Sequence, residues 1–386
     1  MRITAVEARV FTYETDKTSD TDGHTHPGPP RRARNALLTI ACDDGSEGHV
    51  IAPPFAVAEE LLAQFVRPVL LGADPLRIER HWRALYKWQR GSGGRLTDRV
   101  LCAVELALWD LVGRKLGQPV WKLLGGYRDR ILAYGSTMCG DDLENGLRTP
   151  EDYGRYAEWL VEKRGYKAVK LHTWMPPIPG APDVRMDYAA CAAVREAVGP
   201  DIPLMLDPNH WYSRQDALWL CRKLEELGFL WIEEMMEEAS LSSYQWLTGH
   251  LRTLNVLGPE SMTGKLWTRA EWASKGACDM IRTGVWDVGG IGPSLKCAHI
   301  AEGFGMACEV HGTGAGNLAV AAAIPNTTYY ERGLLHPFID YDRPPAYLKR
   351  IDDEMDDEGR VHLRDTPGLG QDIDLAYIEA NLVPAP

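Results

Sequence analysis

Short apolar runs recur along the chain from about residue 130 onward, and segments with apolar residues at helical spacing lie between them. The eight runs cover residues 131–137, 168–173, 203–209, 229–234, 255–260, 279–285, 306–311 and 327–333. Buried strands that alternate with amphipathic helices are typical of a parallel β/α barrel. A doubly wound open sheet is the alternative, but no Gly-rich GxGxxG turn follows the first run.

The chain before residue 130 has a mixed pattern. Apolar and polar residues alternate over 1–12 and 35–42, which predicts two strands, and 48–51 predicts a third. Between the first two, the polar, Gly- and Pro-rich stretch Thr15–Arg34 predicts a loop. Helical spacing predicts helices over 56–70, 76–90 and 97–116. We therefore expect an α+β unit here.

These patterns divide the chain into three parts. We expect an N-terminal α+β domain over residues 1–128, a barrel domain over 129–343 and a C-terminal segment over 344–386. The last part is acidic, rich in proline and without a clear period, so we expect it to pack against the N-terminal domain. A length of 386 residues suits a barrel of roughly 200–250 residues with a second domain.

Charge and composition exclude several classes of partner. The formal net charge is −12, whereas a nucleic-acid-binding protein carries a basic patch. No apolar run approaches the roughly 20 residues that span a bilayer, and the N-terminus lacks the features of a signal peptide. The eight cysteines form no CxxC pair, which favours reduced thiols in a cytoplasmic protein.

Acidic residues stand at the ends of three consecutive strand candidates, one β/α unit apart: Asp207, Glu233 and Glu260. The carboxyl ends of barrel strands face the active site, so these side chains are expected to converge. Converging carboxylates repel one another unless a cation lies between them, and oxygen ligands suit Mg²⁺. We predict one Mg²⁺ per subunit, although each acid alone also suits a helix cap. Glu234 is the weaker choice because alternation points it away.

Candidate acids and bases flank this cluster. Lys170 and His172 are two residues apart on one strand and therefore share a face. His311 ends the seventh strand and is expected to border the metal on the opposite side. Histidine exchanges protons near neutral pH, and a desolvated lysine can act as a base. Glu331, on the eighth strand, is expected either to donate a hydrogen bond to a substrate carboxylate or to pair with Arg332.

Together these residues resemble the mandelate racemase/muconate lactonizing enzyme group of the enolase superfamily. The stretches ALWDLVGRKLGQPVWKLLGG and VGGIGPSLKCAHIAEGFGMACEVH are similar to its domain-junction signature and its sixth-to-seventh-strand region. The resemblance implies an α/β fold of the enolase-like type, a (β/α)7β TIM-like barrel with an N-terminal α+β capping domain, and a homo-oligomer. It also implies roles for the matching residues: metal ligands Asp207, Glu233 and Glu260, catalytic His311, electrophilic Glu331, and Asn209 of a DxN motif.

The chain departs from this group at three places. His172 stands where the usual KxK pair has its second lysine. The group's histidine is oriented by an Asp at the position of Gly284; Asp287 lies three residues later, where we expect it to point elsewhere, so His311 is expected to lack its partner. The usual Pro after the Glu pair is absent from EEMMEEAS, which predicts a remodelled loop after the fourth strand.

The resemblance implies Mg²⁺-dependent removal of the proton α to a carboxylate. We expect a lyase that dehydrates a sugar acid to a 2-keto-3-deoxy acid, with His172 or His311 as base and the other as acid. A racemase or epimerase and a lactone cycloisomerase use the same enolate chemistry and remain alternatives. Two further classes are a hydrolase, suggested by the HxH of His24 and His26, and a non-catalytic barrel, suggested by the missing Asp at position 284.

Polar and aromatic residues near the strand ends suit a polyhydroxy substrate. We expect contacts from Asn209, His210, Trp174 and Trp211. His24 and Arg31 lie in the stretch before the second strand, where they provide a local basic patch for an anion, in a segment that the resemblance implies closes over the site. A solvated loop is the alternative for that stretch.

Overall fold

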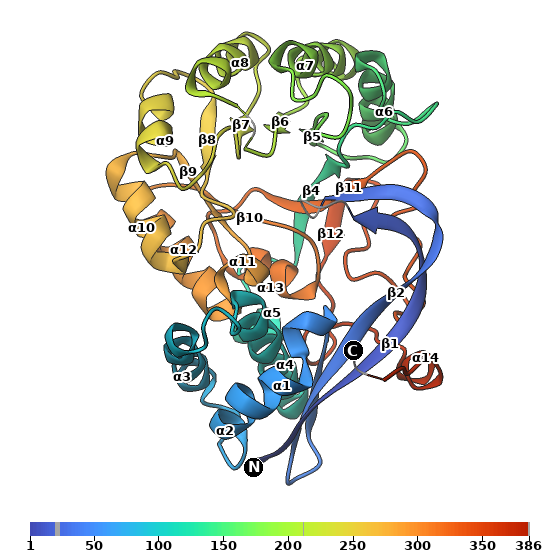
Figure 1. Cartoon of the computed structure of the whole chain (residues 1–386), viewed down its shortest axis with the longest axis vertical. Coiled ribbons are helices and arrows are strands. Elements are labelled where there is room, and N and C mark those ends of the chain that lie inside the picture. The colour runs from blue at the N-terminus through green and yellow to red at the C-terminus, as the bar shows by residue number, and fades with distance from the viewer. Residues whose placement is uncertain (20–23, 211, 385–386) are drawn as a thin grey trace.

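Eight parallel strands form the centre of the protein, in the order β10-β9-β8-β7-β6-β5-β4-β11, and helices surround them (Figure 1). The structure is a computed structural model that describes residues 1–19, 24–210 and 212–384. The strands match the eight predicted runs and confirm the barrel: β4 (Arg130–Thr137), β5 (Val169–His172), β6 (Leu204–Asp207), β7 (Trp231–Ile232), β8 (Asn255–Gly258), β9 (Met280–Thr283), β10 (Cys308–Val310) and β11 (Tyr329–Leu335).

The helices between these strands begin at residues suited to a helix N-terminus. Thr149 and Asp152 form a capping box at the start of α6, and the side chains of Asp183 and Ser213 accept backbone N–H groups at the starts of α7 and α8. The helices are α6 (Pro150–Glu162), α7 (Val184–Val198), α8 (Arg214–Glu226), α9 (Leu241–Thr248), α10 (Lys265–Lys275), α11 (Val285–Val288), α12 (Ile291–Gly303) and α13 (Ala315–Ala323).

The inside of the barrel is built in two layers with different chemistry. The lower layer is a cluster of buried apolar and aromatic side chains from seven strands: Tyr134, Ala168, Met205, Trp231, Leu257, Met280 and Tyr329. Side chains two positions further along a strand point to the same face. For five of these strands the next inward position holds a charged residue: Lys170, Asp207, Glu233, Arg282 and Glu331. The apolar layer therefore forms the floor beneath a charged layer at the carboxyl ends.

The N-terminal part combines a three-stranded antiparallel sheet with helices. The sheet contains β1 (Ile3–Ser19), β2 (Thr25–Cys42) and β3 (Glu47–Ala52). Short helical segments follow in η1 (Pro54–Val57), α1 (Glu59–Leu61), η2 (Leu62–Val66) and α2 (Arg67–Leu70), and then α3 (Ile78–Gly91), α4 (Asp98–Leu116) and α5 (Val120–Leu123). α4 ends where Gly117 adopts a left-handed conformation, φ +64°. The predicted α+β unit is confirmed.

The loop predicted over Thr15–Arg34 is wrong, because β1 and β2 extend through most of it. The two strands stay paired from Thr12 opposite Arg34 to Ser19 opposite Thr25, with one irregularity after Thr15. The prolines misled this prediction. Proline lacks a backbone N–H, but this disrupts a strand only where a neighbouring strand would accept that N–H. β3 pairs with β2 only over Ala36–Ala41, so the prolines of β2 lie where that side of the strand has no partner.

The C-terminal segment contacts both parts of the molecule. Its strand β12 (Arg360–His362) pairs antiparallel with β4 of the barrel. Its helix α14 (Leu375–Ala380) lies beside β1 (Figure 1), where Ile378 packs against Phe11 and Leu37. The division at residues 128 and 343 remains a prediction. Within the described ranges, no helix combines the length and apolar character needed to cross a membrane.

Candidate metal and catalytic centre

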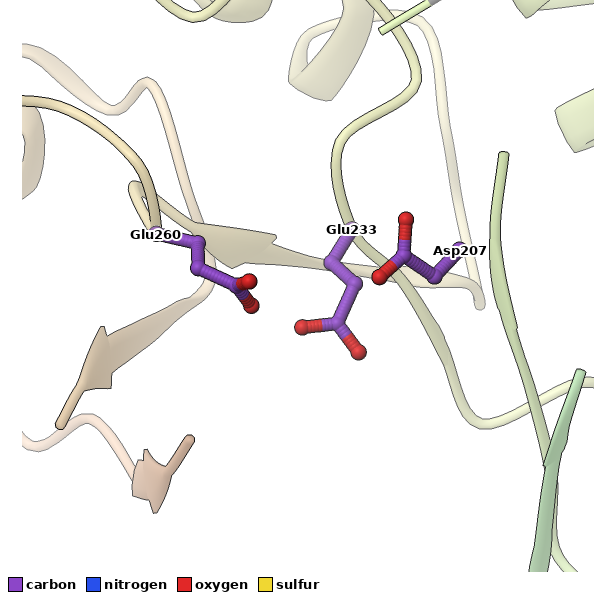
Figure 2. A group of neighbouring side chains, drawn as sticks. All are labelled: Asp207, Glu233 and Glu260. Carbon is purple, nitrogen blue, oxygen red and sulfur yellow. The ribbon is translucent and has the colours of Figure 1, made fainter. Parts of the chain in front are cut away.

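Three carboxylates meet at the carboxyl ends of β6, β7 and β8. Asp207 ends β6, Glu233 follows β7 and Glu260 follows β8, and one oxygen of each lies within 4.8 Å of the others. Figure 2 shows the three carboxylate groups pointing toward one another. All three side chains are buried: Asp207 is 3%, Glu233 0% and Glu260 8% exposed. Within the described ranges this is the one acidic or His/Cys cluster with metal-ligand spacing.

The donor set and the local charge both fit a divalent cation. Glu233 Oε2 is buried with Arg282 Nε 2.9 Å away, but the two atoms lack the geometry of a hydrogen bond, so this carboxylate oxygen keeps lone pairs for a further ligand. Glu260 and the charged layer together provide four carboxylates and two cations. The carboxylates are Asp207, Glu233, Glu260 and Glu331 and the cations are Lys170 and Arg282, so these six side chains have a formal charge of −2. Hard oxygen ligands and this charge match Mg²⁺.

Lys170 lies among the carboxylates. Its Nζ is 2.9 Å from Glu233 Oε1, 3.0 Å from Glu331 Oε1 and 3.7 Å from Asp207 Oδ2. Burial lowers the pKa of Lys170, but Glu233 and Glu331 outweigh this effect and hold that pKa well above its usual value. The arrangement therefore favours a lysine that keeps its proton.

His172 is fixed by the first barrel strand. Its Nδ1 lies 2.8 Å from the carbonyl oxygen of Thr137, to which it donates, and its backbone N–H donates to Thr137 Oγ1 at 3.1 Å. Because a carbonyl only accepts, the Nδ1 proton is committed there. Nε2 then faces Asp207 Oδ2 at 3.1 Å. His172 thus presents an unprotonated nitrogen, whenever the ring is neutral, to one end of the acid row, the three carboxylates Asp207, Glu233 and Glu260.

His311 lies at the other end of the acid row, with Nε2 3.1 Å from Glu260 Oε1. Its Nδ1 donates to Asp287 Oδ2 at 2.7 Å, so the expectation that His311 lacks a partner is wrong. The one-turn helix α11 carries Asp287 back over Gly284, where a Cβ atom would overlap Asp287 Oδ2. Burial lowers the pKa of His311, but Glu260 and Asp287 raise it to about 10.

Glu331 is held as an acceptor. It pairs with Lys170, receives Arg282 Nη2 at 2.9 Å and accepts the backbone N–H of Gly312 at 2.8 Å. Burial raises the pKa of Glu331, but Lys170 and Arg282 outweigh it and lower that pKa well below its usual value. Its predicted pairing with Arg332 is wrong: Arg332 is buried elsewhere, on Tyr166 and Asp342. A hydrogen bond donated by Glu331 would require a proton that two cations oppose.

The predicted substrate contacts separate into two groups. Asn209 lies beside the acid row, where its backbone N–H donates to Asp207 Oδ1 at 3.0 Å. His210 also lies near, but Glu234 at 2.9 Å and the Met236 carbonyl at 3.2 Å occupy both ring nitrogens. Glu234 thus pairs with His210 outside the acid row.

The second group lies in the loop after β5 and at the start of β2. Trp174 is 2% exposed and packs edge-on against Tyr153, with ring centroids 4.9 Å apart, so its ring contacts protein. Arg31 donates to the Lys17 carbonyl within the β1–β2 hairpin, and His24 lies directly before β2. Trp211 lies outside the described residues.

Sequence reasoning missed Arg282. This side chain is 0% exposed, and its guanidinium contacts Glu233, Glu260 and Glu331 at 2.9, 3.0 and 2.9 Å. A signal was present: Arg282 interrupts an apolar strand in phase with the inward-facing Met280. A cation at such a position is expected only where buried carboxylates balance it.

Residues 12–125 match the mandelate racemase/muconate lactonizing enzyme N-terminal domain, and residues 152–377 match the enolase C-terminal domain-like family. The chain belongs to this group of the enolase superfamily. Its members share the barrel and cap described above, so the family and the fold expected from the sequence are both confirmed.

Several relatives of known structure or activity resemble all or most of the chain. A D-glucarate dehydratase from Agrobacterium tumefaciens, solved in complex with magnesium, is 60% identical, with a TM-score of 0.98 and full coverage of both chains. A D-galactarolactone cycloisomerase from Agrobacterium fabrum is 29% identical over the full length of both chains. An arabinonate dehydratase from Saccharolobus solfataricus is 30% identical, over 86% of this chain and 87% of its own.

Proposed function

We propose that this protein is a Mg²⁺-dependent hydro-lyase that removes water from a sugar acid to give a 2-keto-3-deoxy acid, with D-glucarate as the first candidate. The observation that carries the proposal is the row of three buried carboxylates between two histidines. The 60% identity to a D-glucarate dehydratase supports the substrate, and the arabinonate dehydratase supports the class of reaction.

Asp207, Glu233 and Glu260 are the residues that would hold Mg²⁺. Bound there, the ion would stabilise the negative charge that develops on the substrate carboxylate as the α-proton leaves. Lys170 adds a fixed positive charge within 3.0 Å of Glu233 and Glu331. Its proton is engaged by these carboxylates, so we assign Lys170 an electrostatic role and not that of the base.

The two histidines differ in their partners, and this difference suggests their roles. His172 donates from Nδ1 to the Thr137 carbonyl, which directs Nε2 at the acid row, where it can accept the α-proton. His311 donates from Nδ1 to the Asp287 carboxylate, which favours the doubly protonated ring. We therefore assign His172 as the base and His311 as the acid that protonates the departing β-hydroxyl.

Lactone cycloisomerisation is the second candidate, because the cycloisomerase relative matches over its full length. Mass spectrometry of the products separates the two. We expect D-glucarate, incubated with the protein and Mg²⁺, to yield a 2-keto acid lighter by one water. A product of unchanged mass from a sugar lactone, with no product from open sugar acids, would favour the cycloisomerase and contradict the dehydratase.

We further propose that the protein acts in the cytoplasm as a homo-oligomer. All eight cysteines are buried as free thiols, which suits a reducing compartment. Exposed aromatic side chains on the cap and barrel, such as Trp88 at 49% and Trp267 at 44%, suit an interface between subunits. Sedimentation of the purified protein tests the assembly, and a monomer would contradict it.

A further inference from the structure

We propose that Glu238, in the loop after β7, is a positioning residue that fixes Glu260 for metal binding. The inference rests on the proposed function, because it concerns Mg²⁺ held by Asp207, Glu233 and Glu260. Glu238 lies outside the acid row and contacts the backbone of Glu260 rather than its carboxylate.

The contacts are direct and short. Both oxygens of Glu238 accept the backbone N–H of Glu260, at 2.8 and 3.0 Å, and Oε2 also accepts the N–H of Ser261 at 2.8 Å. Two consecutive N–H groups therefore point at one carboxylate. Hydrogen bonds with an ionised acceptor are about twice as strong as neutral ones, so this clamp fixes the peptide plane from which the Glu260 side chain extends.

Arg269 of α10 holds the other side of the same segment. It is 0% exposed, and its Nη2 and Nη1 donate to the carbonyls of Glu260 and Met262, each at 2.7 Å. Glu238 and Arg269 thus engage the N–H and the C=O of Glu260 respectively. A residue held at both ends has little freedom to turn its side chain out of the acid row.

The burial of Glu238 indicates that its hydrogen bonds to the Glu260 segment are needed to stabilise its carboxylate. Glu238 is 1% exposed, and a buried carboxylate costs free energy unless hydrogen bonds stabilise it. Residues that hold metal ligands in place typically change metal affinity by roughly 10- to 100-fold when mutated. The loop that supplies Glu238 is the one in which the family's usual proline is absent.

The neighbouring residue offers a matched control. Glu237 precedes Glu238 in the same loop, has the same side chain and is exposed. Its carboxylate accepts only the local N–H of Ala239, at 3.1 Å, among the hydrogen bonds of the described residues. A change at Glu237 therefore alters the charge of the loop without releasing Glu260.

The test is calorimetric titration of Mg²⁺ into the full-length wild type, Glu238→Gln and Glu237→Gln, each first shown to unfold cooperatively on heating. An amide can offer only one acceptor oxygen to the two N–H groups. We expect Glu238→Gln to raise the Mg²⁺ dissociation constant roughly 10- to 100-fold and Glu237→Gln to leave it within about twofold. If Glu238→Gln does not fold, Glu238→Asp, which keeps the charge but shortens the reach, takes its place with the same expected direction.

Equal affinity of the Glu238 variant and the wild type would overturn the inference while leaving the proposed function intact. Equal weakening by the Glu237 and Glu238 variants would overturn it too, because loop charge alone would then explain the effect. Absence of Mg²⁺ binding by the wild type would instead contradict the proposed function.

Discussion

At the scale of single residues, the decisive feature is the hydrogen bond between His311 and the Asp287 carboxylate. The sequence predicted the acid row and both histidines, because regular spacing and strand phase determine which side chains converge. It did not predict the His311–Asp287 pair, since the one-turn helix α11 that returns Asp287 to the site is too short to leave a periodic signal. Gly284 leaves the space that Asp287 occupies.

A methyl group at position 284 tests this pair. We expect Gly284→Ala to displace Asp287 from His311 and to lower kcat by roughly 100-fold or more, the range of lost general acid catalysis. Because the variant acts through Asp287, Gly284→Ala combined with Asp287→Asn is expected to be no slower than the slower single variant. Gly303→Ala is the control, since a Cβ there meets open space. Wild-type kcat for Gly284→Ala, measured by steady-state kinetics, would refute this role.

At the scale of elements, the cap and barrel are joined by a side chain at a helix terminus. Glu105 of α4 is 3% exposed and accepts the N–H groups of Ile291 and Gly292, the first residues of α12. Gly290 precedes them with φ +134°, and a Cβ atom there would overlap the Glu105 carboxylate. The sequence predicted α4 and the Gly pair separately, but no local pattern could show that the two meet.

This junction predicts a pH dependence of stability. Burial raises the pKa of Glu105 to about 7, although the two N–H groups act in the opposite direction. Because the pKa of Glu105 is higher in the folded protein, the folded state favours the protonated carboxyl. The contribution of Glu105 to the free energy of unfolding is therefore complete below the pKa of the unfolded chain, near 4.3, and is lost as the pH rises through the folded pKa of about 7.

We therefore expect the free energy of unfolding of the wild type, relative to Glu105→Gln, to fall between pH 5 and pH 8. The size should be on the order of 2 to 3 kcal/mol. Urea unfolding of both proteins at several pH values measures it. A constant or rising difference would show that Glu105 is ionised throughout the range.

At the scale of the whole molecule, the barrel and its two-layered interior follow from strand phase. Apolar residues fill the floor, and the next inward positions carry the charges, so fold and site were largely predictable together. The extent of the β1–β2 hairpin was not, because pairing between distant strands overrode the local preferences of proline and glycine. The acidic chain, with a net charge of −12, also contains a buried centre whose formal charge of −2 a divalent ion would balance.

The central claim is that this acidic centre activates the α-proton of a sugar acid only when it holds a divalent ion. Proton NMR of D-glucarate with the purified protein in D₂O tests it most directly, with Mg²⁺ present and after its removal by EDTA. We expect loss of the α-proton signal and growth of a 2-keto-3-deoxy product with Mg²⁺, and neither after EDTA. Turnover that continues unchanged in EDTA, or an α-proton signal that persists with Mg²⁺ as it does without protein, would contradict the account.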